Sequence, residues 1–129
     1  MSKKAIIRQF DPVIYPRKIW VAITSDLKNI SDMFLDKNSK GEMIYIESIS
    51  NKFHAITQLV TQKKTNYLGV VIVFSLKSSI TIKNIAHEAT HAARIIWDEL
   101  GEDPTGEEAD AYLVGWIAEC CEKVKNNKC

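Results

Sequence analysis

The sequence predicts a single α+β domain in which a small, mostly antiparallel sheet packs against two helices. Strand-like segments fill much of the first 75 residues, whereas two long helical patterns fill the last third of the chain. Strands followed by helices favour this architecture over alternating βαβ units. A length of 129 residues is typical of one domain, so we expect residues 1–129 to form one unit with a polar tail over about 125–129.

The N-terminal segments predict two strands and a helix. Two short strands are expected between residues 5 and 24, separated by Asp11-Pro12 and Tyr15-Pro16, which are turn signals. Ser25-Asp26 offers an N-cap, and apolar residues then recur at helical spacing. We therefore expect a helix from about Asp26 to Asp36.

Three more strands are expected in the middle of the chain. Residues 43–46 form a short apolar candidate, and residues 53–61 and 67–75 form two longer ones. The polar stretch 62–66 joins the longer pair, which predicts a hairpin.

Two helices are predicted to complete the domain. Thr81 can cap a helix over residues 82–100, and Gly101 is suited to end it. A second helix is expected over about 107–124.

The composition narrows the classes of function. The chain has 17 basic and 16 acidic residues, a formal net charge of +1, so binding to nucleic acid through bulk charge is not expected. The longest apolar run, Leu68–Phe74, is far shorter than the roughly 20 residues that span a bilayer. No signal-peptide core is present near the N-terminus, and the three cysteines lie in the last ten residues. We expect a cytoplasmic protein with free thiols and no membrane partner.

The helix predicted over 82–100 contains His87-Glu88-Ala89-Thr90-His91, an H-E-x-x-H motif. Side chains four residues apart lie on one face of a helix, so both imidazoles can bind one Zn²⁺ at roughly 2.0 to 2.1 Å. Glu88 lies one step round the helix, where it can take a proton from a water molecule activated by the zinc. The alternative is a helix whose histidines serve packing alone. Apolar residues on most sides predict a mostly buried helix, whose histidines would need metal partners.

A catalytic zinc site needs a third protein ligand. Arg94 and Trp97 exclude the pattern that would place a third histidine on the same helix, so acids on the next helix are the candidates. At 100° per residue, Glu108 lies at the shoulder of the apolar stripe of that helix, and it is the predicted ligand. The other acids that stay open are Asp110, Glu119 and Glu107. Acids at this helix N-terminus also have a simpler explanation, which is stabilisation by the helix dipole.

The motif, followed by Ala92 and by the segment Glu108–Trp116, resembles small gluzincin-type zincin metallopeptidase-like proteins encoded by bacteriophages and prophages. The stretches Phe10–Val21 and Ile80–Ile82 resemble the same group. The resemblance implies a minimal zincin fold, His87, His91 and Glu108 as zinc ligands, and Glu88 as catalytic base. Tyr112 stands where gluzincins commonly have an acid.

The sequence therefore predicts a zinc-dependent metallopeptidase that hydrolyses peptide bonds with Glu88 as general base. Its partner would be a peptide or protein substrate added to an edge strand of the 53–75 hairpin. A larger phage or host assembly is a further possible partner. The alternative is a non-catalytic, zincin-like virion or regulatory binding protein with a structural or vestigial zinc site.

Overall fold

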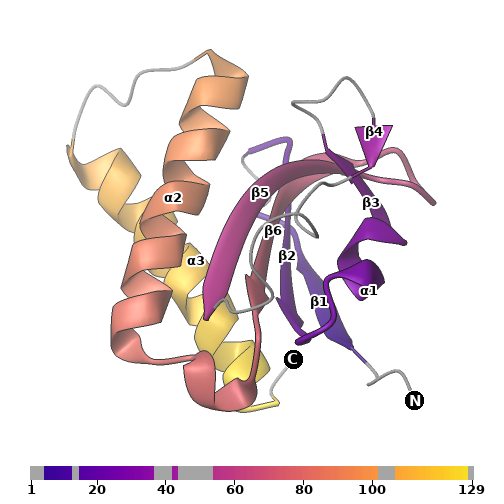
Figure 1. The fold of residues 1–129 in the computed structure, drawn as a ribbon. Coiled ribbons are helices and arrows are strands. Elements are labelled where there is room, and N and C mark those ends of the chain that lie inside the picture. The colour runs from indigo at the N-terminus through magenta and orange to yellow at the C-terminus, as the bar shows by residue number, and fades with distance from the viewer. Residues whose placement is uncertain (1–4, 13–14, 37–41, 44–53, 102–106, 128–129) are drawn as a thin grey trace.

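A computed structural model of the chain describes residues 5–12, 15–36, 42–43, 54–101 and 107–127 (Figure 1). The strands are β1 (Ile6–Phe10), β2 (Lys18–Ile23), β3 (Phe34–Asp36), β4 (Glu42–Met43), β5 (Ala55–Gln62) and β6 (Leu68–Phe74). The helices are α1 (Lys28–Ser31), the 3₁₀ turn η3 (Lys77–Ser79), α2 (Ile82–Leu100) and α3 (Glu107–Lys125).

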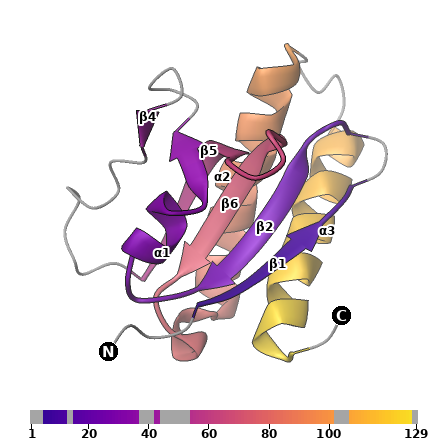
Figure 2. The same cartoon turned by 90° about the vertical axis from the view of Figure 1, so that its right-hand side faces the viewer.

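The described strands form one sheet in the order β1-β2-β6-β5-β3-β4. The β2–β6 pair is parallel and the other pairs are antiparallel. The long helices α2 and α3 cover one face of the sheet, and the short helix α1 lies on the opposite face (Figures 1 and 2). The chain is thus a small α+β domain, as its sequence predicts, with a mixed but mostly antiparallel sheet.

Strand β6 lies at the centre of the sheet and explains the apolar run in the sequence. All its residues from Gly69 to Phe74 are buried, because helices cover both faces. Side chains of alternate residues enter two separate cores. Val70, Ile72 and Phe74 face α2 and α3, whereas Val71 and Val73 face α1. The apolar run is therefore a strand buried on both sides.

Two glycines have positions that a side chain would disturb. A Cβ at Gly69 would collide with the carbonyl group of Lys18 and the ring of Trp20, so the close β2–β6 pairing requires glycine there. Gly101 has a φ of 68° at the end of α2, a left-handed conformation that glycine adopts without strain. At the other end of α2, the side chain of Thr81 accepts a hydrogen bond from the backbone N–H of Asn84 at 3.1 Å. The predicted bounds of α2 are confirmed.

The helix predicted from Asp26 to Asp36 is wrong in its second half. Helix α1 ends at Ser31, and Phe34–Asp36 form β3, which pairs with the end of β5. Phe34 is fully buried with its ring edge-to-face against Trp20, at 5.0 Å between centroids. Strand pairing and this burial outweigh the helical spacing. The predicted strand at 43–46 is described only at Met43, in β4, and its remainder lies outside the described residues.

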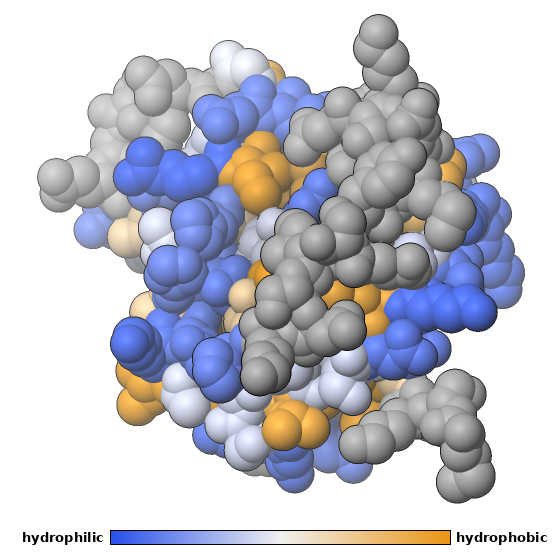
Figure 3. All heavy atoms as spheres, viewed as in Figure 1, coloured by the Kyte–Doolittle hydropathy of each residue, from blue (hydrophilic) through white to orange (hydrophobic). Residues whose placement is uncertain are grey.

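The other predicted elements are present. The N-terminal pair is β1 and β2, the predicted hairpin is β5 and β6, and the last helix is α3. Within the described parts of the chain, no helix is long and apolar enough to cross a membrane. The face seen in Figure 3 carries many hydrophilic side chains, with hydrophobic ones in smaller patches between them.

Candidate active site

The two histidines of the motif lie on the exposed face of α2, one turn apart. Their Nε2 atoms are 3.1 Å from each other, and the side chain of His87 is 64% exposed. This corrects the expectation of a mostly buried helix. The buried residues of α2 form a stripe toward the sheet and α3, and that stripe omits both histidines because neither layer reaches their side of the helix.

The histidine pair fits a shared metal ion. Two nitrogens bound to one tetrahedral zinc at 2.0 to 2.1 Å are separated by about 3.3 Å. The observed Nε2–Nε2 separation of 3.1 Å is close to that value. The same distance also allows a hydrogen bond between two neutral rings. The separation of the two imidazole nitrogens is therefore suitable for part of a zinc site.

Glu88 differs from its neighbours in being buried, with 6% of its surface exposed. Its Oε1 accepts a hydrogen bond of 2.7 Å from the hydroxyl of Thr57 in β5. Its Oε2 lies 3.9 Å from Nε2 of His87. The carboxylate is thus held between the strand and the histidine pair. Burial alone would make such a carboxylate costly, and the Thr57 bond offsets part of that cost.

Thr57 is a residue of the site that the sequence analysis missed. The signal available was strand periodicity, since Ala55, Thr57 and Leu59 share one face of β5. That face packs on α2, where a threonine among apolar residues needs a hydrogen-bond partner. The partner itself lies on another element, and sequence spacing does not reveal it.

A groove of about 310 Å³ runs between α2 and the first half of β5. Its described lining residues are Ala55, Ile56, Thr57, Gln58, His87, Glu88, His91 and Ile95. The groove thus places the two histidines and the glutamate of the H-E-x-x-H motif beside the first half of strand β5. Its volume is at the lower end of ligand pockets, large enough for a side chain and a stretch of backbone.

The first half of β5 has an open edge within the described residues. Strand β3 pairs only with Val60, Thr61 and Gln62, so residues 55–59 have a described partner on the β6 side alone. Backbone bonds link Ser75 to His54 and Gln62 to Tyr67, which sets the alternation of the antiparallel ladder.

This alternation determines which backbone groups are available at the groove. Even-numbered residues of β5 direct their N–H and C=O groups to β6, and odd-numbered residues direct them away from it. The N–H and C=O groups of Ala55 and Thr57 therefore point toward the open edge. Both residues also line the groove that contains the histidine pair.

Glu108, the predicted third ligand, lines a different hollow. That hollow is formed on α3 by Glu108, Ala111, Tyr112, Gly115, Trp116 and Glu119. It shares no described residue with the histidine groove. Tyr112, 75% exposed, also lies here rather than beside the histidines. The structure brings His87, Glu88 and His91 together and does not bring Glu108 to them.

The other acids considered for this role have different partners. Asp110 accepts a hydrogen bond from Nε1 of Trp97 at 3.1 Å, and Glu119 forms an ion pair with Lys123 at 3.4 Å. The side chain of Glu107 lies outside the described residues. Among the described residues, no group of three or more His, Cys, Asp or Glu side chains is placed to hold a metal ion.

The packing of the two long helices explains where Glu108 lies. The contact between Trp97 and Asp110 places the start of α3 beside the C-terminal part of α2. Trp97 is six residues beyond His91, which is about 9 Å along the helix axis. The first turn of α3 is therefore displaced along α2 from the histidine pair.

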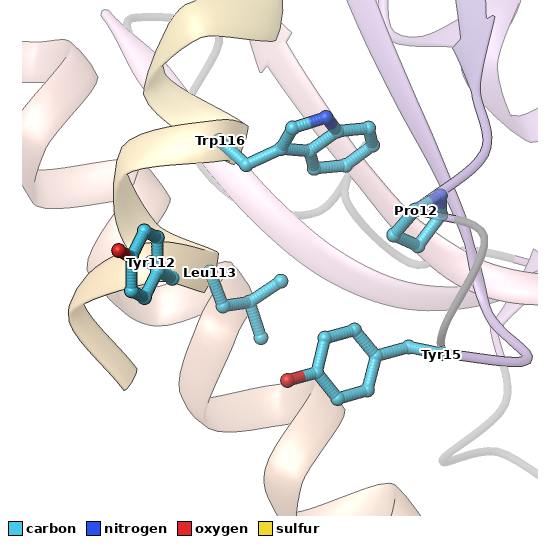
Figure 4. A pocket seen from close by; sticks show the side chains of 5 residues that line it. All are labelled: Pro12, Tyr15, Tyr112, Leu113 and Trp116. Carbon is cyan, nitrogen blue, oxygen red and sulfur yellow. The ribbon is translucent and has the colours of Figure 1, made fainter. Parts of the chain in front are cut away.

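A second hollow adjoins the one that Glu108 lines and shares Tyr112 and Trp116 with it, where α3 faces the connection between β1 and β2 (Figure 4). It is lined by Pro12 and Tyr15 from that connection and by Tyr112, Leu113 and Trp116 from α3. The ring of Tyr15 packs edge-to-face on Trp97 at 5.3 Å between centroids. This hollow is apolar and contains none of the predicted catalytic or ligand residues.

The two described cysteines lie in the core and are free thiols. Burial raises the pKa of both Cys120 and Cys121 to about 12, and for Cys121 the nearby Cys120 and Glu88 add to the effect. These thiols therefore stay protonated at neutral pH, so they are poor candidates for metal ligands or nucleophiles. Both cysteines belong to the core formed by the sheet, α2 and α3.

Comparisons with known proteins found no relative of this chain. No family model matches the chain, and neither a curated protein nor a solved structure matches it.

Proposed function

We propose that this protein is a zinc-dependent metallopeptidase. The observation that carries the proposal is the groove between α2 and β5. It combines two imidazole nitrogens 3.1 Å apart, a buried carboxylate next to them and a strand edge that no described strand covers. Those are a pair of metal ligands, a base and a surface for an extended peptide.

In this proposal, His87 and His91 hold the metal and Glu88 moves the proton. A bound zinc would supply Lewis acidity to the substrate carbonyl and a lowered pKa to a water molecule. Oε2 of Glu88 faces the histidine side of the groove, because Oε1 is occupied by the Thr57 hydroxyl. Oε2 would take a proton from the attacking water and give it to the leaving amine.

The strand edge favours substrates in extended conformation. A peptide that lies along β5 would exchange backbone hydrogen bonds with Ala55 and Thr57, whose N–H and C=O groups point outward. Its main chain would then lie beside the histidine pair in the groove. Unfolded segments, termini and loops fit this arrangement, whereas helices do not, since their backbone groups are already paired.

The alternative function is that of a non-catalytic, zincin-like virion or regulatory binding protein with a structural or vestigial zinc site. One observation favours it, namely that no third ligand lies in the groove among the described residues. Peptidase zinc sites commonly use three protein ligands and leave one position open. In this alternative, zinc removal unfolds the protein, and no peptide is cleaved under any condition.

The decisive experiment is Glu88→Gln in zinc-loaded protein, assayed on a random peptide library read by mass spectrometry. Gln keeps the shape of the side chain but cannot accept the proton, so cleavage should fall by about 10²- to 10⁴-fold. Zinc content should stay unchanged, because Glu88 is not one of the proposed ligands. Glu119→Gln makes the same chemical change at an exposed position of α3 and should leave cleavage unchanged.

Two results would contradict the peptidase proposal. One is cleavage by Glu88→Gln at the rate of the unmodified protein, which would show that the activity does not depend on this base. The other is a zinc-loaded protein that cleaves no member of the library, which would leave the binding function in its place.

A further inference from the structure

The hydroxyl of Thr57 reaches across from β5 to the carboxylate of α2. It donates to Oε1 of Glu88 at 2.7 Å, and the two residues are 31 positions apart in the sequence. We infer that Thr57 is a positioning residue that holds Glu88 with its second oxygen toward the histidine pair. The inference rests on the proposed function, in which Glu88 is the base.

The Thr57 bond makes the two oxygens of Glu88 unequal. Oε1 is occupied by the Thr57 hydroxyl, whereas Oε2 lies 3.9 Å from Nε2 of His87. Because Glu88 is 6% exposed, few water molecules can replace the threonine as a donor. The bond therefore favours one orientation of the carboxylate. A base already held in its working orientation needs no rearrangement when the substrate arrives.

Thr57 also lies where an extended substrate would bind. Its side chain points to α2, whereas its backbone N–H and C=O groups point away from β6, to the edge of β5 that has no partner among the described strands. A peptide paired with that edge would fix the backbone of the residue whose side chain holds the base. Seating of the substrate main chain and orientation of Glu88 would thus depend on one residue.

The test compares three variants of the full-length, zinc-loaded protein. Thr57→Val keeps the shape of the side chain and removes the hydroxyl, whereas Thr57→Ser keeps the hydroxyl. Thr61→Val makes the same change on the same face of β5, at a residue that pairs with β3 outside the groove. Each variant is measured for kcat and KM on a library peptide, for zinc content and for thermal unfolding.

We expect Thr57→Val to lower kcat by about 10- to 100-fold, with zinc content and KM close to those of the unmodified protein. Thr57→Ser should restore most of kcat, and Thr61→Val should have full kcat. A purely structural role would instead lower the unfolding temperature and leave kcat of the folded fraction unchanged. That result would overturn the inference.

A crystal structure of Thr57→Val provides a readout that needs no activity. The inference requires the Glu88 carboxylate to rotate, so that Oε2 no longer faces His87. A carboxylate that keeps its position in this variant would overturn the inference. If the zinc-loaded protein cleaves no peptide, the proposed function fails. The orientation of Glu88 in the crystal structure of Thr57→Val still decides whether Thr57 positions it.

Discussion

Helices α2 and α3 lie side by side on the same sheet face, but they place their reactive side chains differently. On α2, Glu88 is buried at a groove with the two histidines exposed beside it. On α3, the two thiols are buried in the core, whereas Glu108 and Glu119 lie on the surface. The reactive groups of α2 converge on one space, and those of α3 are divided between core and solvent.

This difference shows what spacing along a helix can and cannot predict. His87 and His91 are four residues apart on one element, so helical geometry alone brings their Nε2 atoms together. Glu108 belongs to another helix, and its distance from the pair depends on how α2 and α3 are displaced along each other. That displacement follows from side-chain packing, including the Trp97–Asp110 bond.

The largest expected effect tests this difference directly through zinc affinity. His87→Ala and His91→Ala each remove one of two converging nitrogens, so we expect zinc affinity to fall by more than about 100-fold. Glu108→Ala should keep the affinity of the unmodified protein, because Glu108 lies in the hollow on α3. Competition titration with a chromophoric chelator measures all three.

Loss of zinc affinity in Glu108→Ala would contradict the view that α2 alone supplies the zinc ligands. It would show that the first turn of α3 reaches the histidine pair when metal is bound, as the resemblance to gluzincins implies. Zinc affinity retained in both histidine variants would instead exclude the pair as the metal site.

A second prediction concerns how the free energy of unfolding depends on pH through the two thiols buried on α3. Burial raises the pKa of Cys120 and Cys121 from 9.0 to about 12 in the folded protein. Above pH 9 the unfolded chain therefore loses protons that the folded chain keeps, which stabilises the unfolded state. The free energy of unfolding should be unaffected by these thiols below pH 9 and should fall by up to about 1.4 kcal/mol per pH unit for each thiol as the pH rises toward 12.

Urea unfolding between pH 8 and pH 11 measures this loss. The double variant Cys120→Ala, Cys121→Ala should be less stable at pH 8, because it leaves cavities, yet its stability should fall less steeply with pH. Equal slopes for the double variant and the unmodified protein would show that the thiols are not protected by burial. Titration of other groups contributes to both slopes and does not affect their difference.

Much of the fold could be predicted because its signals are local. Thr81 and Gly101 mark the ends of α2, and the run from Leu68 to Phe74 marks a buried strand. The helix predicted to continue through Phe34 failed because the deciding contacts are distant. Phe34 packs on Trp20 and its strand pairs with the end of β5, and neither contact is visible in the spacing of nearby residues.

The candidate site also contains some residues that the sequence could predict and others that it could not. The histidine pair and Glu88 could be found from one motif on one helix. Thr57 could not, because strand periodicity places it on the face toward α2 but does not show which residue of α2 is its partner. The exposure of the histidines was also missed, since apolar residues near them in the sequence turn toward the sheet and α3.

The smallest expected effect concerns the strand beside the histidine groove. Ala55→Pro removes a backbone N–H that points to the open edge of β5, so it deletes one donor to an extended substrate without removing a bond to β6. One lost hydrogen bond corresponds to a rise in KM of about 2- to 10-fold for a cleaved library peptide.

Ala55→Gly keeps the N–H and should leave KM unchanged. Ile56→Pro removes an N–H directed to β6 and should destabilise the fold, which thermal unfolding detects. An unchanged KM in Ala55→Pro would show that peptides do not pair with this edge, and the groove on α2 would then resemble the hollows on α3 in lacking a backbone surface for binding.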